Sequence, residues 1–226
     1  FDSSPELEQH LFEHNKMELL DEVRKVANIK VHYIRQQHMR GLGDAILCAK
    51  DFTDGEPFGV ILGDDLVYNG DDTPALGQLL EQYEKTGGTI VGCQLVEREQ
   101  VSSYGIIKGN LTENSDLVLV EDMVEKPKIE EAPSRLAALG RYVITPDVFE
   151  ILEHTKPGKG GEIQLTDALR IMAHSGNVYA YNFKGKRYDT GNKLGFLKAT
   201  VEYALRRDDL GPAFKNYLSD VVRNLS

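Results

Sequence analysis

The apolar positions in the first half of the chain switch between helical and strand spacing. Residues 5–27 repeat apolar side chains at helical intervals, and IKVHYIRQ, residues 29–36, alternates and is rich in β-branched residues. These patterns predict a helix followed by a strand. The elements predicted in this half are helix 5–27, strand 29–36, a short helix within 41–52, strand 58–65, helix 74–85 and strand 89–96. This strand–helix–strand order favours βαβ units and a largely parallel sheet.

The spacing of apolar positions changes in the second half of the chain, where it predicts three strands joined by short connections. Its predicted elements are strands 104–109, 117–127 and 136–145, helix 146–153, helix 162–174, strand 177–186 and closing helices 193–207 and 212–222. The short connections indicate an antiparallel or mixed insertion beside the parallel sheet. The sequence contains no repeat, low-complexity tract or obvious linker. We therefore predict one α/β domain over residues 1–226.

Composition narrows the classes of protein to consider. The 226 residues are 41% hydrophobic, enough for one sizeable core, and the net charge of −10 disfavours binding to nucleic acid or to an anionic membrane. No apolar run approaches the length of a membrane span. Cys48 and Cys93 are not in a CxxC motif and are interpreted as reduced core residues, which favours a cytoplasmic protein.

Two carboxylates follow the apolar run of VILGDD, residues 60–65. Asp64 and Asp65 come directly after Gly63, and Asn69-Gly70 follows as a turn signal. One interpretation is simply a turn, since Asp, Asn and Gly are turn formers. The other is a divalent metal site, which requires hard oxygen ligands on a rigid element. This stretch alone leaves both open.

Ligands of open α/β sheets bind at the carboxyl ends of strands, so polar groups placed there are candidates. Gln36 follows the first predicted strand, and its amide could read the edge of a base. Gly41 opens the sequence GLG, in which glycine would let the backbone approach a flat ring. A tight turn explains GLG equally well, and the missing third glycine disfavours a dinucleotide site.

Two later segments carry further candidates. Asp189, in DTGN, could complete a magnesium site with Asp64, or could belong to a turn and helix N-cap. In Glu125-Lys126-Pro127, the proline biases Lys126 to an extended backbone and would aim its charge at a phosphate. Glu125 could accept hydrogen bonds from sugar hydroxyls. The alternative for this segment is an exposed charged turn.

The order of the motifs resembles that of a known family. The motifs are RQ…GLGDAI, VILGDD, SSYGII, VEKPK, GRYVITPDVFEIL, GEIQLTDAL and KGKRYDTGNKLG followed by VEYALR. Together they resemble the bacterial UTP–glucose-1-phosphate uridylyltransferases, which are sugar-nucleotide pyrophosphorylases, over essentially the whole chain. The resemblance implies a Rossmann-like nucleotidyltransferase fold with a mixed, mainly parallel central sheet, a small antiparallel insertion and C-terminal helices.

The resemblance also implies an activity and its cofactor. The enzyme would join UTP and glucose 1-phosphate into UDP-glucose and pyrophosphate, with Mg²⁺ as cofactor. Asp64 resembles the family's metal aspartate, and Asp189 stands where sister enzymes have a second metal carboxylate. Asp65 is expected to support Asp64 and to be one of the residues that bind the nucleotide.

Other roles carry over to the substrate side. Lys126 resembles the lysine that contacts the sugar phosphate and, with Asp64, is the expected catalytic residue. Glu125 resembles the carboxylate on the glucose hydroxyls, and Gly105 the backbone contact to the sugar. Gln36 and Gly41 resemble the residues that read uracil.

One departure from the family pattern limits these expectations. The family's N-terminal Gly-rich loop of GTR type, with the lysine after it, does not occur in these 226 residues. We therefore expect an N-terminally truncated chain that is inactive alone and that associates with itself through opened sheet edges as a homo-oligomer. The alternatives are a thymidylyl- or cytidylyltransferase of the same fold, or a non-catalytic fragment that binds sugar nucleotides.

Overall fold

The computed structural model describes residues 2–111 and 116–225. Within them the chain forms two compact units, the first ending at Gln37 and the second beginning at His38. The two units are treated separately below. The expectation of one domain over residues 1–226 stays a prediction.

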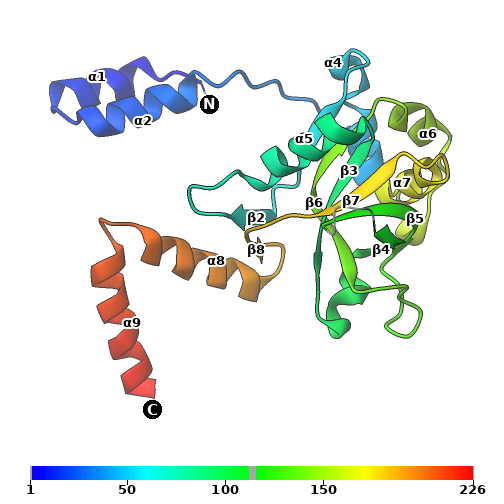
Figure 1. The fold of residues 1–226 in the computed structure, drawn as a ribbon. Coiled ribbons are helices and arrows are strands. Elements are labelled where there is room, and N and C mark those ends of the chain that lie inside the picture. The colour runs from blue at the N-terminus through cyan, green and yellow to red at the C-terminus, as the bar shows by residue number, and fades with distance from the viewer. Residues whose placement is uncertain (1, 112–115, 226) are drawn as a thin grey trace. The chain divides into compact units, whose positions relative to one another are not determined.

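The first unit is built on a helical hairpin, in which α1 (Pro5–Glu13) lies beside α2 (Met17–Ala27) (Figure 1). The predicted helix over 5–27 is thus interrupted, at Asn15, whose φ of 55° lies in the left-handed region. Leu11 and Leu20 are buried between the helices, and Arg24 forms a 2.8 Å ion pair with Glu8. The apolar spacing is therefore the same as that of one helix, but the chain reverses in the middle.

The strand predicted over residues 29–36 is wrong, because the structure assigns no strand to this segment. A strand needs a neighbour that accepts and donates its backbone hydrogen bonds. The regular elements of the described part of the first unit are both helices. An alternating sequence alone therefore does not make this segment a strand.

The second unit is centred on a six-stranded sheet with the order β1-β6-β3-β7-β5-β4. Its strands are β1 (Phe58–Ile61), β3 (Thr89–Leu95), β4 (Gly105–Leu111), β5 (Leu117–Glu125), β6 (Leu136–Ile144) and β7 (Val178–Asn182). Each of these agrees with a predicted strand in type and approximate position. The sheet is mixed, as predicted.

The predicted predominance of parallel pairs is wrong for the described residues, in which only β3 and β7 pair in parallel. β1, β3 and β7 do run in one direction, as the βαβ pattern predicts. β6 runs the opposite way and lies between β1 and β3, so it pairs antiparallel with both. Nearly every residue of β6 is buried, which suits a strand covered on both faces. The predicted insertion thus contributes a strand to the middle of the sheet.

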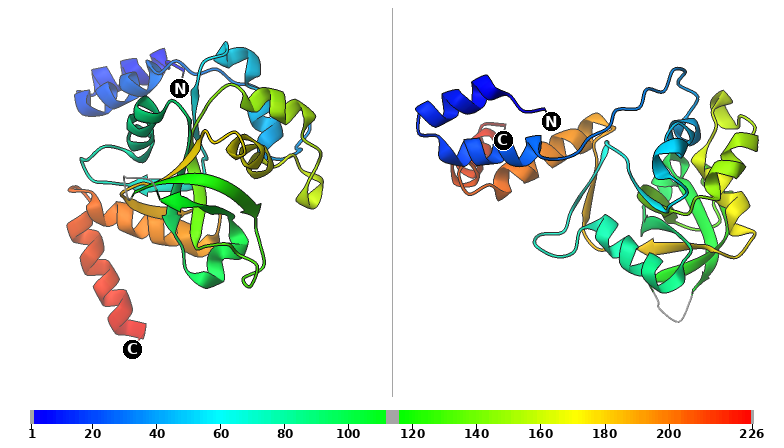
Figure 2. Two further views of the ribbon diagram at one scale, coloured as in Figure 1. Left: turned by 45° about the vertical axis from the view of Figure 1, so that its right-hand side comes forward. Right: turned by 90° about the horizontal axis from the view of Figure 1, so that it is seen from above.

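Helices cover both faces of this sheet. The helices α3 (Leu42–Leu47), α6 (Val148–His154) and α7 (Leu165–Ala173) pack on one face, and α5 (Ala75–Thr86) packs on the other (Figures 1 and 2). A separate hydrophobic core lies on each face of the sheet. Successive side chains of β3 point into opposite cores, so Val91 lies in the core under α7 and Ile90 in the core under α5. The short elements α4 (Lys50–Thr53), η1 (Arg98–Ser103) and η2 (Lys159–Gly161) complete the connections.

A second, two-stranded sheet was not predicted. β2 (Asp65–Tyr68) pairs antiparallel with β8 (Lys186–Asp189), and Asp65 is opposite Asp189 in the register. The sequence around Asp65 indicates only a turn, because the partner strand lies far along the chain. The consequence is that the two aspartate segments discussed above meet in space.

Two helices follow β8. α8 (Lys193–Arg206) packs against β8 and leads to α9 (Gly211–Leu225) (Figure 1). Asn192 is the N-cap of α8 and accepts a 2.7 Å hydrogen bond from the Gly195 backbone N–H. The N-cap interpretation of DTGN is therefore confirmed for Asn192.

Two predictions concerned the cysteines and the lack of a membrane-spanning segment. Both cysteines are unpaired, and Cys93 is buried in the core, where burial raises the pKa of its thiol. Cys48 is exposed, so its predicted place in the core is wrong. Within residues 2–111 and 116–225, no helix has the length and apolar character needed to cross a membrane.

Candidate active site

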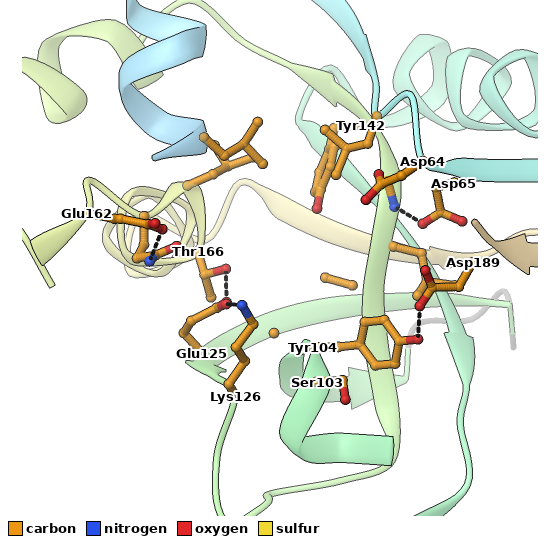
Figure 3. Close-up of a pocket in the computed structure, with 18 of the residues that line it drawn as sticks. Asp64, Asp65, Ser103, Tyr104, Glu125, Lys126, Tyr142, Glu162, Thr166 and Asp189 are labelled. Carbon is orange, nitrogen blue, oxygen red and sulfur yellow. Dashed lines mark hydrogen bonds and ion pairs between the residues drawn. The ribbon is translucent and has the colours of Figure 1, made fainter. Parts of the chain in front are cut away.

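A cavity of about 330 Å³ opens where β1, β5 and β8 end. This volume is in the range of small-ligand pockets. Figure 3 shows Asp64, Asp189 and Tyr104 on one side of it and Glu125 and Lys126 on the other. The predicted residues that line the cavity are Asp64, Asp65, Gly105, Glu125, Lys126 and Asp189. Residues from distant parts of the chain thus converge on one cavity, and four of them, Asp64, Glu125, Lys126 and Asp189, stand at or just beyond the carboxyl ends of strands, as expected.

Asp65 is held inside the protein. One oxygen of its buried carboxylate accepts a 2.5 Å bond from Arg187 Nε, and the other accepts a 3.0 Å bond from the Gly140 N–H. The Arg141 guanidinium, whose pKa is lowered by burial, donates to the Asp65 carbonyl at 2.5 Å. Both carboxylate oxygens are occupied by protein donors, an arrangement that supports the turn bearing Asp64.

Asp64 differs from its neighbour in being exposed. Its carbonyl accepts two hydrogen bonds from Thr190, at 2.8 Å from the backbone N–H and 2.9 Å from the hydroxyl. Its carboxylate makes no hydrogen bond or ion pair within the described part of the chain. The backbone of Asp64 is therefore fixed to the segment after β8, and its carboxylate faces the cavity.

The Asp189 carboxylate is turned toward the same space. Its Oδ1 accepts a 3.1 Å bond from the Gly191 N–H, and its Oδ2 accepts a 3.0 Å bond from the Tyr104 hydroxyl. A β-carbon on Gly191 would lie 3.2 Å from Asp189 Oδ1 and 2.9 Å from Asp64 Oδ2. The two carboxylates thus flank one small space that only glycine leaves open.

These two carboxylates fit a divalent metal ion. Mg²⁺ is usually bound through one or two carboxylates, with phosphate oxygens and water as the other ligands. No cluster of three or more His, Cys, Asp or Glu side chains suited to a metal occurs in residues 2–111 and 116–225. The donor set therefore suits an ion that a phosphorylated substrate helps to bind.

Arg187 joins the two aspartate segments to Tyr104. Its side chain is only 14% exposed, donates to the Tyr104 hydroxyl at 3.1 Å and lies 3.9 Å from Asp189 Oδ2. Burial lowers its pKa, but the bonds to Asp65 and Tyr104 outweigh burial, so the net shift of the Arg187 pKa is upward. Burial also raises the pKa of Tyr104, whose hydroxyl therefore keeps its proton.

The opposite wall carries the Glu125–Lys126 pair. The Thr166 hydroxyl donates to Glu125 Oε2 at 2.7 Å, and Lys126 Nζ lies 3.6 Å from Glu125 Oε1. A β-carbon on Gly105 would lie 3.0 Å from the Thr166 hydroxyl and 3.3 Å from Glu125 Oε2. Glycine at position 105 therefore leaves the backbone open beside the fixed carboxylate.

The backbone of Lys126 is not extended, so that prediction is wrong. Its φ is +45°, in the left-handed region that residues other than glycine rarely adopt. Its N–H donates to the Tyr104 carbonyl at 3.0 Å. This bond joins the turn at the end of β5 to the residue that precedes β4, and the left-handed φ is observed despite Pro127. Unusual backbone of this kind is concentrated at functional sites.

Gly41 lies beside the cavity and has a clear structural role. Its φ is +98°, and a β-carbon would stand 2.8 Å from the β-carbon of Glu162. The adjoining backbone pairs with Ile163, which accepts from the Gly43 N–H at 2.9 Å and donates to the Arg40 carbonyl at 2.7 Å. The tight-turn interpretation of GLG thus accounts for the glycines. Leu42 and Glu162, on either side of this contact, line the cavity.

Gln36 belongs to the first unit, and its contact with the base stays a prediction. Tyr104 and Thr166 were given no role from the sequence, and the basic cluster 184–187 was predicted only to offset the negative net charge, although Tyr104, Thr166 and Arg187 all line the cavity. Arg187 precedes Asp189 by two residues on a strand, so both side chains lie on one face. That spacing is the signal that could have identified Arg187.

Comparisons with known proteins agree with this geometry. A family model described as nucleotidyl transferase matches residues 2–205. The UTP–glucose-1-phosphate uridylyltransferase of Bacillus subtilis (strain 168) is 49% identical over 224 residues, which cover 97% of this chain and 76% of the relative.

Solved structures show the same likeness. A UDP-glucose pyrophosphorylase complexed with UDP-glucose has a TM-score of 0.81 at 46% identity, covering 86% of this chain and 74% of that one. The UTP-bound enzyme from Acinetobacter baumannii has a TM-score of 0.86 at 34% identity, and the match covers 96% of this chain and 76% of that one. The resemblance drawn from the motifs and the nucleotidyltransferase fold are confirmed. The chain belongs to the nucleotidyl transferase family, among the UTP–glucose-1-phosphate uridylyltransferases.

Proposed function

We propose that this cavity joins UTP and glucose 1-phosphate to give UDP-glucose and pyrophosphate. The observation that carries the proposal is the pairing, across one cavity, of the Asp64–Asp189 carboxylates with the Glu125–Lys126 pair. The first pair suits a metal-bound triphosphate, and the second suits a phosphorylated sugar. The reactions named for the relatives fit this arrangement.

On the sugar side, Lys126 supplies a positive charge for the phosphate of glucose 1-phosphate. Glu125, fixed by Thr166, accepts hydrogen bonds from sugar hydroxyls, and the open backbone at Gly105 allows the ring to approach. The phosphate oxygen of the sugar is then held to attack the α-phosphorus of UTP in line. Positioning and charge neutralisation account for the catalysis, with no covalent intermediate on the protein.

On the nucleotide side, members of the nucleotidyl transferase family generally use a divalent metal ion, and we propose Mg²⁺. Asp64 and Asp189 are the residues that would hold it. The ion would supply charge stabilisation to the phosphate oxygens during transfer. Gly41 is proposed to read the uracil, and Asp65 to support Asp64 through its bond to Arg187 rather than to contact the nucleotide.

The same proposal extends to assembly and location. Large apolar side chains are exposed along α8 and α9, and such surfaces are typical of interfaces. They are Leu194, Phe196 and Leu197 on α8, Tyr217 and Val222 on α9, and Leu210 in the connection between the two helices. They support a homo-oligomer. The unpaired cysteines suit a reducing compartment, which supports work in the cytoplasm.

The test is pyrophosphate release from glucose 1-phosphate with UTP, dTTP, CTP and ATP in turn. Here and below, rates are measured on an enzyme in which the family's Gly-rich loop region precedes these residues, because the 226 residues alone are expected to be inactive. We expect the largest kcat/KM with UTP. A larger value with dTTP or CTP would identify a sister specificity. Binding of UDP-glucose without any release of pyrophosphate would instead favour a protein that only binds sugar nucleotides.

A further inference from the structure

We propose that Tyr104 is a positioning residue for the metal carboxylate Asp189, and that it fixes the position of Asp189 relative to Lys126. This inference rests on the proposed function. Tyr104 lies between the two halves of the site, immediately before β4, and its ring forms part of the cavity wall (Figure 3).

Two different groups of Tyr104 make the two connections. Its backbone carbonyl accepts from the Lys126 N–H at 3.0 Å, which helps to hold the left-handed turn at Lys126. Its side-chain hydroxyl donates to Asp189 Oδ2 at 3.0 Å. One residue therefore sets the separation between the lysine proposed for the sugar phosphate and a carboxylate proposed for the metal.

Arg187 fixes the direction in which the hydroxyl of Tyr104 donates. Its NH1 group donates to that hydroxyl at 3.1 Å, and its guanidinium carbon lies 4.9 Å from the centre of the tyrosine ring. A guanidinium can only donate, so the single hydroxyl hydrogen of Tyr104 is left for Asp189. Arg187 is itself held by its 2.5 Å bond to Asp65.

The bond from Tyr104 determines which oxygen of Asp189 faces the cavity. Oδ2 is taken up by Tyr104, and Oδ1 is left on the side of Gly191 and Asp64. Without the hydroxyl, the bond from the Gly191 N–H to Oδ1 remains and Oδ2 is left with Arg187 at 3.9 Å, so the Asp189 carboxylate is less firmly oriented. The backbone bond between Tyr104 and Lys126 is unaffected by such a change. The two connections can therefore be separated by experiment.

The variant Tyr104→Phe removes the hydroxyl and keeps the ring over Arg187, so the fold is retained. The matched control is Tyr188→Phe, because the Tyr188 hydroxyl donates to Glu202 in the contact between β8 and α8. Binding of Mn²⁺, as a spectroscopic probe, is measured by electron paramagnetic resonance on each protein with UDP-glucose present. KM for glucose 1-phosphate is measured alongside.

Loss of a group that orients a metal ligand commonly costs 10- to 100-fold in affinity, so we expect Tyr104→Phe to raise the Kd for Mn²⁺ by about 10-fold. KM for glucose 1-phosphate should not change, and Tyr188→Phe should bind Mn²⁺ as the unmodified protein does. Equal Mn²⁺ affinity of Tyr104→Phe and the unmodified protein, or equal losses in both variants, would overturn the inference. Failure of the unmodified protein to bind Mn²⁺ would instead reject the proposed metal site.

Discussion

A β-carbon on Gly191 would stand 2.9 Å from Asp64 Oδ2. The contact is closer than real β-carbons tolerate, but the atom it meets is the end of a flexible side chain. Gly191→Ala should therefore displace the Asp64 carboxylate and leave the fold intact. We expect the Mg²⁺ concentration for half-maximal activity to rise by about 10-fold, as for other changes beside metal ligands.

A Mg²⁺ titration of initial rates and a thermal melt check this expectation. Gly63→Ala is the matched control, because a β-carbon at Gly63 would meet no atom within 4 Å. An unchanged Mg²⁺ requirement in Gly191→Ala would show that the space between the carboxylates is not used.

Asp64 and Asp65 should respond differently to the same substitution. Asp64→Asn removes an exposed charge aimed into the cavity, so turnover should fall by about 100-fold or more without loss of stability. Asp65→Asn removes the closer of the two charged partners of the buried Arg187, a change of a kind that costs about 3 kcal/mol. Rates at saturating Mg²⁺ and Tm values distinguish the two. Equal losses of turnover, with equal Tm, would contradict the metal assignment of Asp64.

Lys126→Ala removes the charge proposed for the phosphate of the sugar. KM for glucose 1-phosphate should rise by about 10-fold or more, the usual range for a hydrogen bond to a charged group, while KM for UTP changes little. Lys126→Arg keeps the charge and should lose less. If only the KM for UTP rises, Lys126 contacts the nucleotide and its assignment to the sugar phosphate is rejected.

Thr166→Val tests the support of Glu125. Valine has the shape of threonine but cannot donate to Glu125 Oε2, so KM for glucose 1-phosphate should rise by about 10-fold. Thr200→Val is the matched control, because the Thr200 hydroxyl donates to the Phe196 carbonyl at 2.9 Å on the exposed side of α8. The steady-state constants of both variants are the measurement, and a similar KM in the two would reject the role of Thr166.

The contact between α8 and β8 should depend on pH. Hydrogen bonds from Lys186 and Tyr188 lower the pKa of Glu202 from 4.5 to about 2. Because the folded pKa is depressed, this contact stabilises the protein fully above pH 4.5 and loses its effect as the pH falls toward about 2. The difference in Tm between the unmodified protein and Glu202→Gln should therefore shrink over that interval. A constant difference from pH 6 to about 2 would contradict this assignment.

Patterns within a short stretch of sequence predicted most elements of the second unit. The buried runs of β3, β5 and β6 and the amphipathic α7 are each recognisable alone, because burial on one or both faces leaves its period in the sequence. What failed depends on partners far along the chain. Residues 29–36 have the alternation of a strand and no strand beside them, and β2 exists only because β8 pairs with it.

The candidate site shows the same division. Asp64, Glu125, Lys126 and Asp189 could be chosen because each stands at the end of a strand or just after it, and the structure brings them to one cavity. The left-handed backbone of Lys126 could not be predicted, because the turn is bonded to the Tyr104 carbonyl, which belongs to another segment of the chain. The bond of Arg187 to Asp65 likewise joins residues on two strands whose pairing no short pattern reveals.

The position of β6 has a consequence for synthesis of the protein on the ribosome. β1 and β3 emerge first, but both pair with β6, whose residues are made after β4 and β5. A nascent chain that has reached only β3 exposes two apolar strands without the neighbour that they share. Such unpaired edges are prone to aggregation, and pairing of distant segments is slow. Chaperone demand during translation should therefore be highest before Ile144 leaves the exit tunnel.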